Sequence, residues 1–272
     1  MTAEFAAFLR PTSILDFEDR SIQALVAERG WRSLEHLPRI AAVYAFVRDD
    51  IPFGYNRTDS ISAAEVLRDR YGQCNTKTTL LMALLRAVGV PCRIQGATIH
   101  KSLQKGVVTG IFYRLAPANI LHSWAEVFLN DQWVALEGVI LDNHYLIGLS
   151  SHLQQRDGPL LGYGVGTAEF SSQPSDFVGI GTSIQMTGVN KKFGAFSDPD
   201  SFYAAHGTNM SGLRAWLFSS WVRYQMNRRV ATIRGCSRSA ACARAQRAKA
   251  PCGSASTESE AIERLHLGDA GP

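Results

Sequence analysis

The sequence contains no apolar run long enough to cross a bilayer. Its longest uninterrupted apolar stretches, such as residues 80–85, are far shorter than the roughly 20 residues that a membrane-spanning helix needs. Near the start, Glu4 stands where a secretory signal peptide would carry basic residues, and no apolar segment of sufficient length follows it. These absences predict a cytoplasmic protein without a transmembrane segment.

Cysteine is scarce, and its spacing lacks the pattern of a metal site. The chain has five cysteines in 272 residues, and no C-x2-C pair occurs among them. Neither a disulfide framework nor a structural zinc site is indicated, so we expect free thiols. The glycine-rich residues 162–166 lack the G-x-G-x-x-G spacing of a dinucleotide site and do not link a predicted strand to a predicted helix. The sequence therefore predicts neither a metal nor a cofactor.

The excess of basic over acidic residues is small. The formal net charge is +4, and 46% of the residues are hydrophobic, which is ample for a packed core. Much of the basic excess falls in the last quarter of the chain, at Arg214, Arg223, Arg228, Arg229, Arg234, Arg238, Arg244, Arg247 and Lys249. Only this last quarter is basic enough to raise the possibility of nucleic-acid binding, and we do not predict such binding.

What the sequence does contain is a cysteine at the start of an apolar helix. Apolar residues recur with the helical period after Cys74, at Leu80, Leu81, Leu84, Leu85 and Val88. Gly89 followed by Pro91 is a common helix ending. Free N–H groups and the positive end of the helix dipole favour a thiolate at such a position. Cys74 is therefore a candidate nucleophile, although buried cysteine is also a common packing residue.

Lys77, one turn further along this helix, has two interpretations. It could bind a substrate carboxylate or lower the pKa of the thiol, and it could equally be a solvated surface lysine. Trp124 and Trp133 could likewise line the site, although core packing is the commoner role of a tryptophan. We retain Lys77 and Trp124 as candidate substrate-binding residues.

A predicted β-hairpin supplies a base and an acid for Cys74. Residues 122–129 are β-branched and aromatic, and Asn130-Asp131 separates them from the apolar residues 133–137. With a two-residue turn, Trp124 aligns with Glu137, and His122 is the diagonal neighbour of Glu137 on the same face, roughly 7 Å away between Cα atoms. A thiol nucleophile needs such a base, oriented by a third group. A three-residue turn would place Glu137 on the opposite face.

Other residues compete for these roles. Glu126 shares a strand with His122 and is four residues away, roughly 13 Å at about 3.3 Å per residue. Asp142 lies in the loop after the hairpin, and the rival bases His100 and His144 have no acid in register. The pairing in the hairpin therefore favours Cys74, His122 and Glu137 as the catalytic residues.

The rest of the chain is organised around this centre. Two helices are predicted within residues 14–48, a capping box at Ser62 opens a short helix before Cys74, and residues 92–99 alternate like a strand. We expect one domain over residues 1–234, with a motif core at about 60–142 and a loop-rich extension at 143–210. A helix at 211–230 should pack its apolar face on the domain. Residues 235–272 should form a disordered tail. The less favoured interpretation of the helix is binding to acidic lipid.

Three consecutive motifs stand out around Cys74 and the hairpin: Y-G-Q-C, then L-L-x-A-L-L-R-A-V-G-V-P-C-R, then H-S-W-A-E-V-F-L-N-D-Q-W-V-A-L-E. Together they resemble the core of the transglutaminase-like superfamily, which is related to papain-like cysteine proteases. The resemblance implies an α+β fold, in which the cysteine helix packs on an antiparallel sheet. It also implies Cys74 as nucleophile, His122 as general acid and base, and Glu137 as the orienting carboxylate. The family usually has aspartate at the third position.

The resemblance implies acyl transfer through a thioester on Cys74, from an amide or ester in a small molecule or peptide. The backbone N–H of Cys74 is a candidate oxyanion donor. Hydrolysis is favoured, and transfer to an amine is the alternative, because the outcome depends on how well the site excludes water. A second alternative is a non-catalytic binding module that uses the groove and the basic C-terminal helix to engage an acidic partner.

Overall fold

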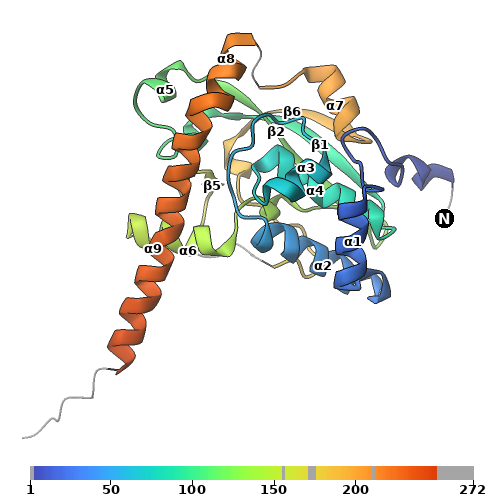
Figure 1. Ribbon diagram of the computed structural model, residues 1–272, viewed down its shortest axis with the longest axis horizontal. Coiled ribbons are helices and arrows are strands. Elements are labelled where there is room, and N and C mark those ends of the chain that lie inside the picture. The colour runs from blue at the N-terminus through green and yellow to red at the C-terminus, as the bar shows by residue number, and fades with distance from the viewer. Residues whose placement is uncertain (1–2, 155–156, 171–175, 210–211, 250–272) are drawn as a thin grey trace, which may run out of the picture.

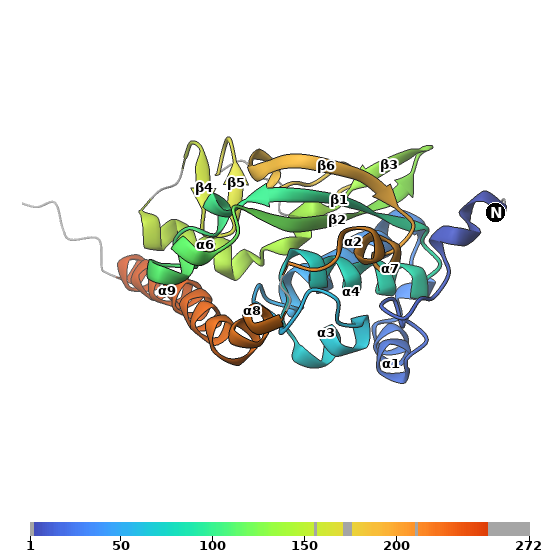
Figure 2. The same ribbon diagram turned by 90° about the horizontal axis from the view of Figure 1, so that it is seen from above.

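A four-stranded antiparallel sheet is the centre of the fold. The computed structural model describes residues 3–154, 157–170, 176–209 and 212–249. Its main sheet has the strand order β3-β2-β1-β6, formed by β1 (Cys92–His100), β2 (Asn119–Leu129), β3 (Gln132–Ala135) and β6 (Val189–Phe196). The helices α1 to α4 lie together on one side of this sheet (Figure 2). The predicted α+β class, with the cysteine helix packed on an antiparallel sheet, is confirmed.

Short helices form the N-terminal part of this layer. They are η1 (Ala3–Phe8), α1 (Arg20–Arg29), η2 (Trp31–Ser33), α2 (His36–Ala45), the π-helical turn η3 (Phe46–Asp50) and α3 (Ala63–Asp69). The predicted cap at Ser62 is present, because its hydroxyl accepts a hydrogen bond from the Glu65 N–H at 3.4 Å. α3 then leads directly into the cysteine helix.

α4 (Cys74–Ala87) is the most deeply buried helix of the fold. Every residue from Asn75 to Ala87 is buried, including threonines and a lysine as well as the apolar stripe. The helix contacts α1, α2 and α3 on one side and β1 and β2 on the other. It begins at Cys74 and ends before Gly89, as the sequence predicts.

The hairpin between β2 and β3 has the predicted two-residue turn. Asn130 and Asp131 have φ values of 51° and 61°, the left-handed pair that a type I′ turn requires. Leu129 therefore pairs with Gln132, as expected. β3 is shorter than predicted, because it ends at Ala135 and the chain turns into the 3₁₀ helix η5 (Glu137–Ile140). Glu137 thus lies just beyond the strand instead of opposite Trp124.

The region between the hairpin and the C-terminal helices contains more regular structure than the sequence suggested. This region contains α6 (Asn143–Leu153), β4 (Leu160–Gly162), β5 (Val165–Thr167), η6 (Met186–Gly188) and α7 (Pro199–His206). Two further short helices, η4 (Lys101–Gln104) and α5 (Gly110–Leu115), lie before the hairpin, between β1 and β2. Within the expected loop-rich extension at 143–210, β6 is instead a strand, which pairs with β1 and forms an edge of the main sheet. β6 is mostly exposed and has two register shifts against β1, so its sequence lacks a regular apolar alternation.

The C-terminal helices form one long arm across the molecule (Figure 1). α8 (Gly212–Leu217), the π-helical turn η7 (Phe218–Val222) and α9 (Arg223–Lys249) follow one another, and α9 packs against α6. The helix is buried at Met226, Val230 and Ile233. The apolar face expected to pack on the domain consists of Leu213, Trp216, Leu217 and Trp221. This expectation was wrong, because all four side chains are exposed. α9 also continues to Lys249, into the predicted tail, while residues 250–272 lie outside the described part.

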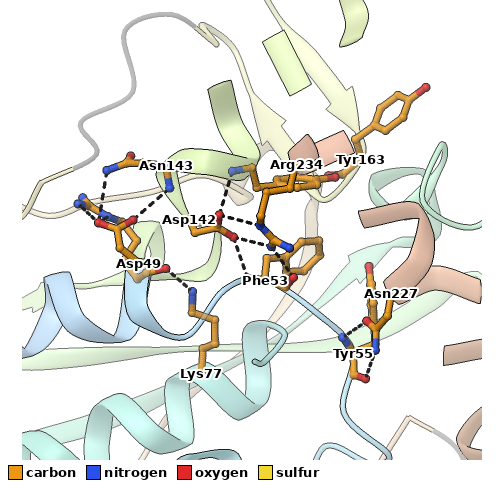
Figure 3. A network of polar contacts seen from close by, with 11 residues as sticks. Asp49, Phe53, Tyr55, Lys77, Asp142, Asn143, Tyr163, Asn227 and Arg234 are labelled. Carbon is orange, nitrogen blue, oxygen red and sulfur yellow. Dashed lines mark hydrogen bonds and ion pairs between the residues drawn. The ribbon is translucent and has the colours of Figure 1, made fainter. Parts of the chain in front are cut away.

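A buried ion pair fastens this arm to the domain. The guanidinium of Arg234 on α9 donates to both oxygens of Asp142, at 3.1 and 2.8 Å, and Asp142 is 1% exposed. Figure 3 shows the Asp142 carboxylate between Arg234 and the backbone of Phe53. Burial by itself would raise the pKa of this carboxyl, but the hydrogen bond and charge of Arg234 outweigh it and lower the pKa. α9 is therefore held by a charge pair as well as by apolar contacts.

Candidate active site

Cys74 occupies the first turn of α4, where polar contacts fix the backbone. The Gln73 N–H donates to the hydroxyl of Thr76 at 3.0 Å, and that hydroxyl donates to Asn56 at 2.6 Å. The side chain of Gln73 accepts from the Asn56 N–H and donates to Asp59. These bonds give the helix a defined start. Cys74, a partly buried residue, lines a cavity next to the sheet.

The thiol of Cys74 has a raised pKa, the opposite of the shift expected for a helix start. Burial is the main cause, and the negative charge of Asp59 adds to it. Hydrogen bonds from the backbone N–H groups of Asn75 and Ser123 act in the other direction but do not outweigh burial. The raised pKa favours the neutral thiol, so a base must remove the proton before Cys74 can act as a nucleophile.

His122 and Glu137 face each other inside the protein. The distance between His122 Nε2 and Glu137 Oε1 is 3.4 Å, and the side chains are 0% and 1% exposed. Among the described residues neither ring nitrogen of His122 makes a hydrogen bond, so this is a close charge contact without hydrogen-bond geometry. The carboxylate of Glu137 accepts hydrogen bonds from the backbone N–H groups of Ile184 and Gln185, which fix its position.

Asn75 and Ser123 join the two halves of the site. The hydroxyl of Ser123 donates to the side-chain oxygen of Asn75 at 2.8 Å, and the amide of Asn75 donates to the carbonyl of Leu121 at 3.2 Å. Since Ser123 follows His122 and its N–H reaches the Cys74 thiol, these bonds hold the start of α4 against β2 where His122 projects. The structure thus brings Cys74, His122 and Glu137 into one region.

The competing residues have other partners. Glu126 pairs with Arg93 at 2.7 Å, and Asp142 caps α6 and binds Arg234. His100 is exposed and caps η4, and His144 is exposed on α6. These four residues do not line the cavity beside Cys74, and neither do His122 and Glu137, so the choice rests on the 3.4 Å contact between His122 and Glu137. The arrangement therefore leaves Glu137 as the acid next to His122.

Lys77 is buried and does not line the cavity. It is fully buried, and its ammonium nitrogen donates to the backbone carbonyl of Arg48 at 3.0 Å (Figure 3). Burial lowers the pKa of Lys77 to about 7, against the opposing charges of Asp142 and Asp49. Lys77 is not among the residues that line the cavity, so it is not placed to touch a substrate there.

Trp124 supports His122 and does not line the cavity. The two rings are 5.6 Å apart between centroids at 36°, and Trp124 is 4% exposed. This contact restricts the rotation of the imidazole ring. Trp133, the other tryptophan of the hairpin, packs on Phe5, Phe8 and Phe128.

A cavity of about 480 Å³ lies beside Cys74. Its wall comes from the start of α4, the loop before α3, the ends of β1 and β2, α5, and the arm formed by α8, η7 and α9. Most of the wall is apolar, and its polar residues include Asp59, Gln73 and Asn209. The volume is in the range of small-molecule sites, roughly 300–1,000 Å³.

Residues 27–138 match the family model described as the transglutaminase-like superfamily. The chain carries a transglutaminase-like core. The match includes Cys74, His122 and Glu137, and it ends within η5. No curated protein sequence matches the chain.

Two solved structures resemble parts of the chain. A structure described as a candidate cysteine protease from Cytophaga hutchinsonii has a TM-score of 0.43 and 13% identity, and covers 74% of this chain and 49% of that one. Red sea bream transglutaminase has a TM-score of 0.27 and 15% identity, and covers 37% of this chain and 22% of that one. The chain thus spans less than half of the length of either protein.

The structure of this transglutaminase-like core adds residues that the sequence did not single out. Asn75 and Ser123 connect α4 to β2, and Asp59 receives hydrogen bonds from Gln73 and Asn209. Their proximity to Cys74 and His122 in the sequence was the only signal for Asn75 and Ser123. In the described part of the chain, no group of three or more histidines, cysteines, aspartates and glutamates could hold a metal ion. No helix among the described residues is long and apolar enough to span a bilayer.

Proposed function

We propose that the protein is a cysteine-dependent acyl-transfer enzyme, with Cys74 as nucleophile, His122 as general acid and base, and Glu137 as the orienting carboxylate. The main support is the 3.4 Å contact between His122 and a carboxylate that two backbone N–H groups hold in place. A buried acid in that position favours the imidazolium that forms during catalysis. The proposed substrates are amides or esters.

In the proposed mechanism, His122 takes the thiol proton as Cys74 attacks. His122 Nε2 faces Glu137, so Nδ1 is the nitrogen available to the thiol. The sulfur forms a bond to the acyl carbon, His122 returns the proton to the leaving nitrogen or oxygen, and the carbon–nitrogen or carbon–oxygen bond breaks. The backbone N–H of Cys74, at the start of α4, is the proposed donor to the oxyanion.

The thioester would then react with water or an amine. Water releases an acid, an amine releases a new amide, and each restores the free thiol. We favour hydrolysis, because the cavity opens to solvent at exposed residues such as Leu115 and Leu217. Adding an excess of a primary amine to the reaction distinguishes the two outcomes: an amide product would show amine transfer.

The test of this proposal is the identification of an acyl-enzyme. After incubation with a pool of amides, esters and thioesters, intact-mass spectrometry should detect an adduct on Cys74 that is absent from Cys74→Ala. Alkylation by iodoacetamide gives a second readout. Because burial raises the pKa of the thiol, we expect His122→Asn to slow the alkylation of Cys74 at neutral pH, and to slow it less at high pH, where the thiol ionises unaided.

Glu137→Gln tests the role of the acid. The substitution keeps the size of the side chain but removes the charge beside His122, and we expect acylation to slow by about 100-fold. Glu126→Gln is the matched control, because Glu126 lies on β2 and pairs with Arg93. Equal rates for the two variants would contradict a catalytic role for Glu137.

A non-catalytic binding module is the second candidate. The observation in its favour is charge: residues 201–257 contain no aspartate or glutamate, while α8 and α9 carry several arginines. This alternative predicts salt-sensitive retention on an anionic matrix that removal of residues 210–249 abolishes and Cys74→Ala does not affect. An adduct on Cys74 together with the absence of such retention would reject it.

A further inference from the structure

We infer that the cavity beside Cys74 binds the long apolar chain of an acyl group, so that the preferred substrates are long-chain acyl amides, esters or thioesters. This inference rests on the proposed acyl transfer at Cys74, and it specifies the class of acyl group. It is drawn from the polarity of the cavity wall, from the bonding of its polar residues and from its opening.

A bonded group of polar residues lies next to Cys74, and most of the remaining wall is apolar. Gln73, Asp59 and Asn209 form a connected group next to Cys74: Gln73 donates to Asp59 at 3.1 Å and Asn209 donates to Asp59 at 2.7 Å. The remaining wall is dominated by apolar side chains from β1, β2, the loop before α5, α5 itself and the C-terminal arm, namely Ile99, Ile120, Val108, Phe112, Phe218, Val222 and Met226. A ligand with a carbonyl at one end and an apolar chain behind it matches this division.

The charged groups in the wall already have partners. The carboxylate of Asp59 accepts from two side-chain amides, and Arg57 forms an ion pair with Glu65 at 2.7 Å. A charged substrate chain in the cavity would therefore lose its hydration without gaining an unpaired counter-charge from these residues. An apolar chain has no such cost, and each buried methylene should strengthen binding by about fourfold.

Two exposed residues of the cavity wall are apolar, and the exposed Arg57 also belongs to the wall. Leu115 on α5 and Leu217 on α8 line the cavity and are also 68% and 42% exposed. The chain of a ligand could therefore enter between α5 and α8 without passing charged groups at these positions. A long acyl chain could come from a lipid in a bilayer or from a water-soluble acyl thioester, and the experiment separates these sources.

The first experiment measures binding without chemistry. The full-length Cys74→Ala variant is titrated calorimetrically with the neutral primary amides of butyric, octanoic and myristic acids. We expect the dissociation constant to fall steeply from the shortest to the longest chain. Affinities that do not depend on chain length would overturn the inference.

Ala215 on α8 provides the variant that fills the cavity. Ala215 lines the cavity, whereas Leu213 on the same helix does not and is 78% exposed. We expect Ala215→Trp to remove most of the preference for the long chain, and Leu213→Trp to leave it unchanged. If Ala215→Trp fails to fold, Leu115→Asp, which places a charge at the exposed opening, should reduce the preference in its place. A preserved preference in the folded variant would contradict this location.

The second experiment measures acylation of Cys74 in the wild-type protein by acetyl, octanoyl and palmitoyl thioesters in solution, and by vesicles that contain a phospholipid with the same palmitoyl ester. Faster acylation by the long-chain thioester indicates the soluble source, and acylation by vesicles alone indicates the lipid. Acylation by short chains only would retain the proposed function and reject the inferred pocket. Chain-length-dependent binding without any acylation would retain the pocket and reject the proposed function.

Discussion

α4 buries polar side chains, whereas the C-terminal arm exposes large apolar ones. α4 buries polar residues, including Lys77, Thr78 and Thr79, along its whole length. The arm exposes large apolar ones: Leu213, Trp216 and Trp221 are 78%, 64% and 50% exposed. In both helices, burial follows the number of elements packed around the helix more closely than the apolar pattern of its sequence.

The surroundings of α4 explain how it tolerates buried polar groups. The helix lies between the sheet and three other helices, and its polar side chains find backbone carbonyls there: Lys77 donates to Arg48 at 3.0 Å and Thr78 donates to Ser123 at 3.1 Å. A buried polar group that is hydrogen-bonded costs little, whereas an unpaired one is expensive. The arm contacts the domain along one side only, so its other face stays exposed.

The largest expected effect concerns Lys77. Its pKa is about 7 in the folded protein and 10.5 ordinarily, so between these pH values the unfolded chain binds the additional proton. The contribution of Lys77 to the free energy of unfolding should therefore rise with pH from about 7 to 10.5, by up to about 5 kcal/mol. Lys77→Met should abolish this rise, as measured by urea denaturation at a series of pH values.

The exposed Lys192 on β6 supplies the control for this measurement. Lys192→Met should retain the dependence on pH that Lys77→Met loses. An identical slope in wild type and Lys77→Met would show that the buried amine is not responsible, and would weaken the contrast between α4 and the arm.

The next effect concerns the attachment of the arm. Arg234→Met leaves the buried carboxylate of Asp142 without its counter-charge, and we expect a loss of stability of about 3–4 kcal/mol. The double variant Arg234→Met with Asp142→Asn should recover part of this loss. Arg228→Met, at an exposed position on the same helix, serves as the control. A cost below about 1 kcal/mol would mean that apolar contacts alone hold the arm.

A smaller effect is expected where α6 and α9 approach most closely. A Cβ atom at Gly148 would collide with the backbone carbonyl of Ile233, and it would also lie 3.1 Å from the Cα of Arg234. Gly148→Ala should therefore lower stability by about 1–3 kcal/mol in chemical denaturation. Gly235→Ala, where a Cβ meets nothing within 4 Å, is the control and should be neutral or stabilising by up to about 1 kcal/mol. Equal effects would indicate that the helices move apart freely.

The smallest effect is expected on the exposed face of the arm. Trp216→Ala should change the free energy of unfolding by no more than about 0.5 kcal/mol, because the side chain is 64% exposed. Trp31, which is 4% exposed and packs on Phe46, gives the contrast, since its replacement by alanine should cost about 3–5 kcal/mol. A large cost at Trp216 would show that the arm buries this face in solution.

Much of the site follows from local sequence rules. The start of α4 at Cys74 and the two-residue turn at Asn130-Asp131 depend on nearby residues, and both form as predicted. The 3₁₀ turn at Glu137 was not predictable in this way, because its position depends on hydrogen bonds with Thr182 and Ile184, more than 40 residues away. The same applies to the raised pKa of the Cys74 thiol, which depends on burial and on Asp59.

Periodicity, capping and turn chemistry act over a few residues, so the sequence alone could predict the cysteine helix and the hairpin, whereas the α+β class came from the resemblance to the transglutaminase-like core. The tertiary structure alone decided that Lys77 is buried away from the cavity, that β6 completes the sheet, and that the arm exposes the apolar stripe that was expected to pack on the domain. Each of these depends on which distant segments meet, and therefore on how much solvent and how many hydrogen-bond partners remain for each side chain.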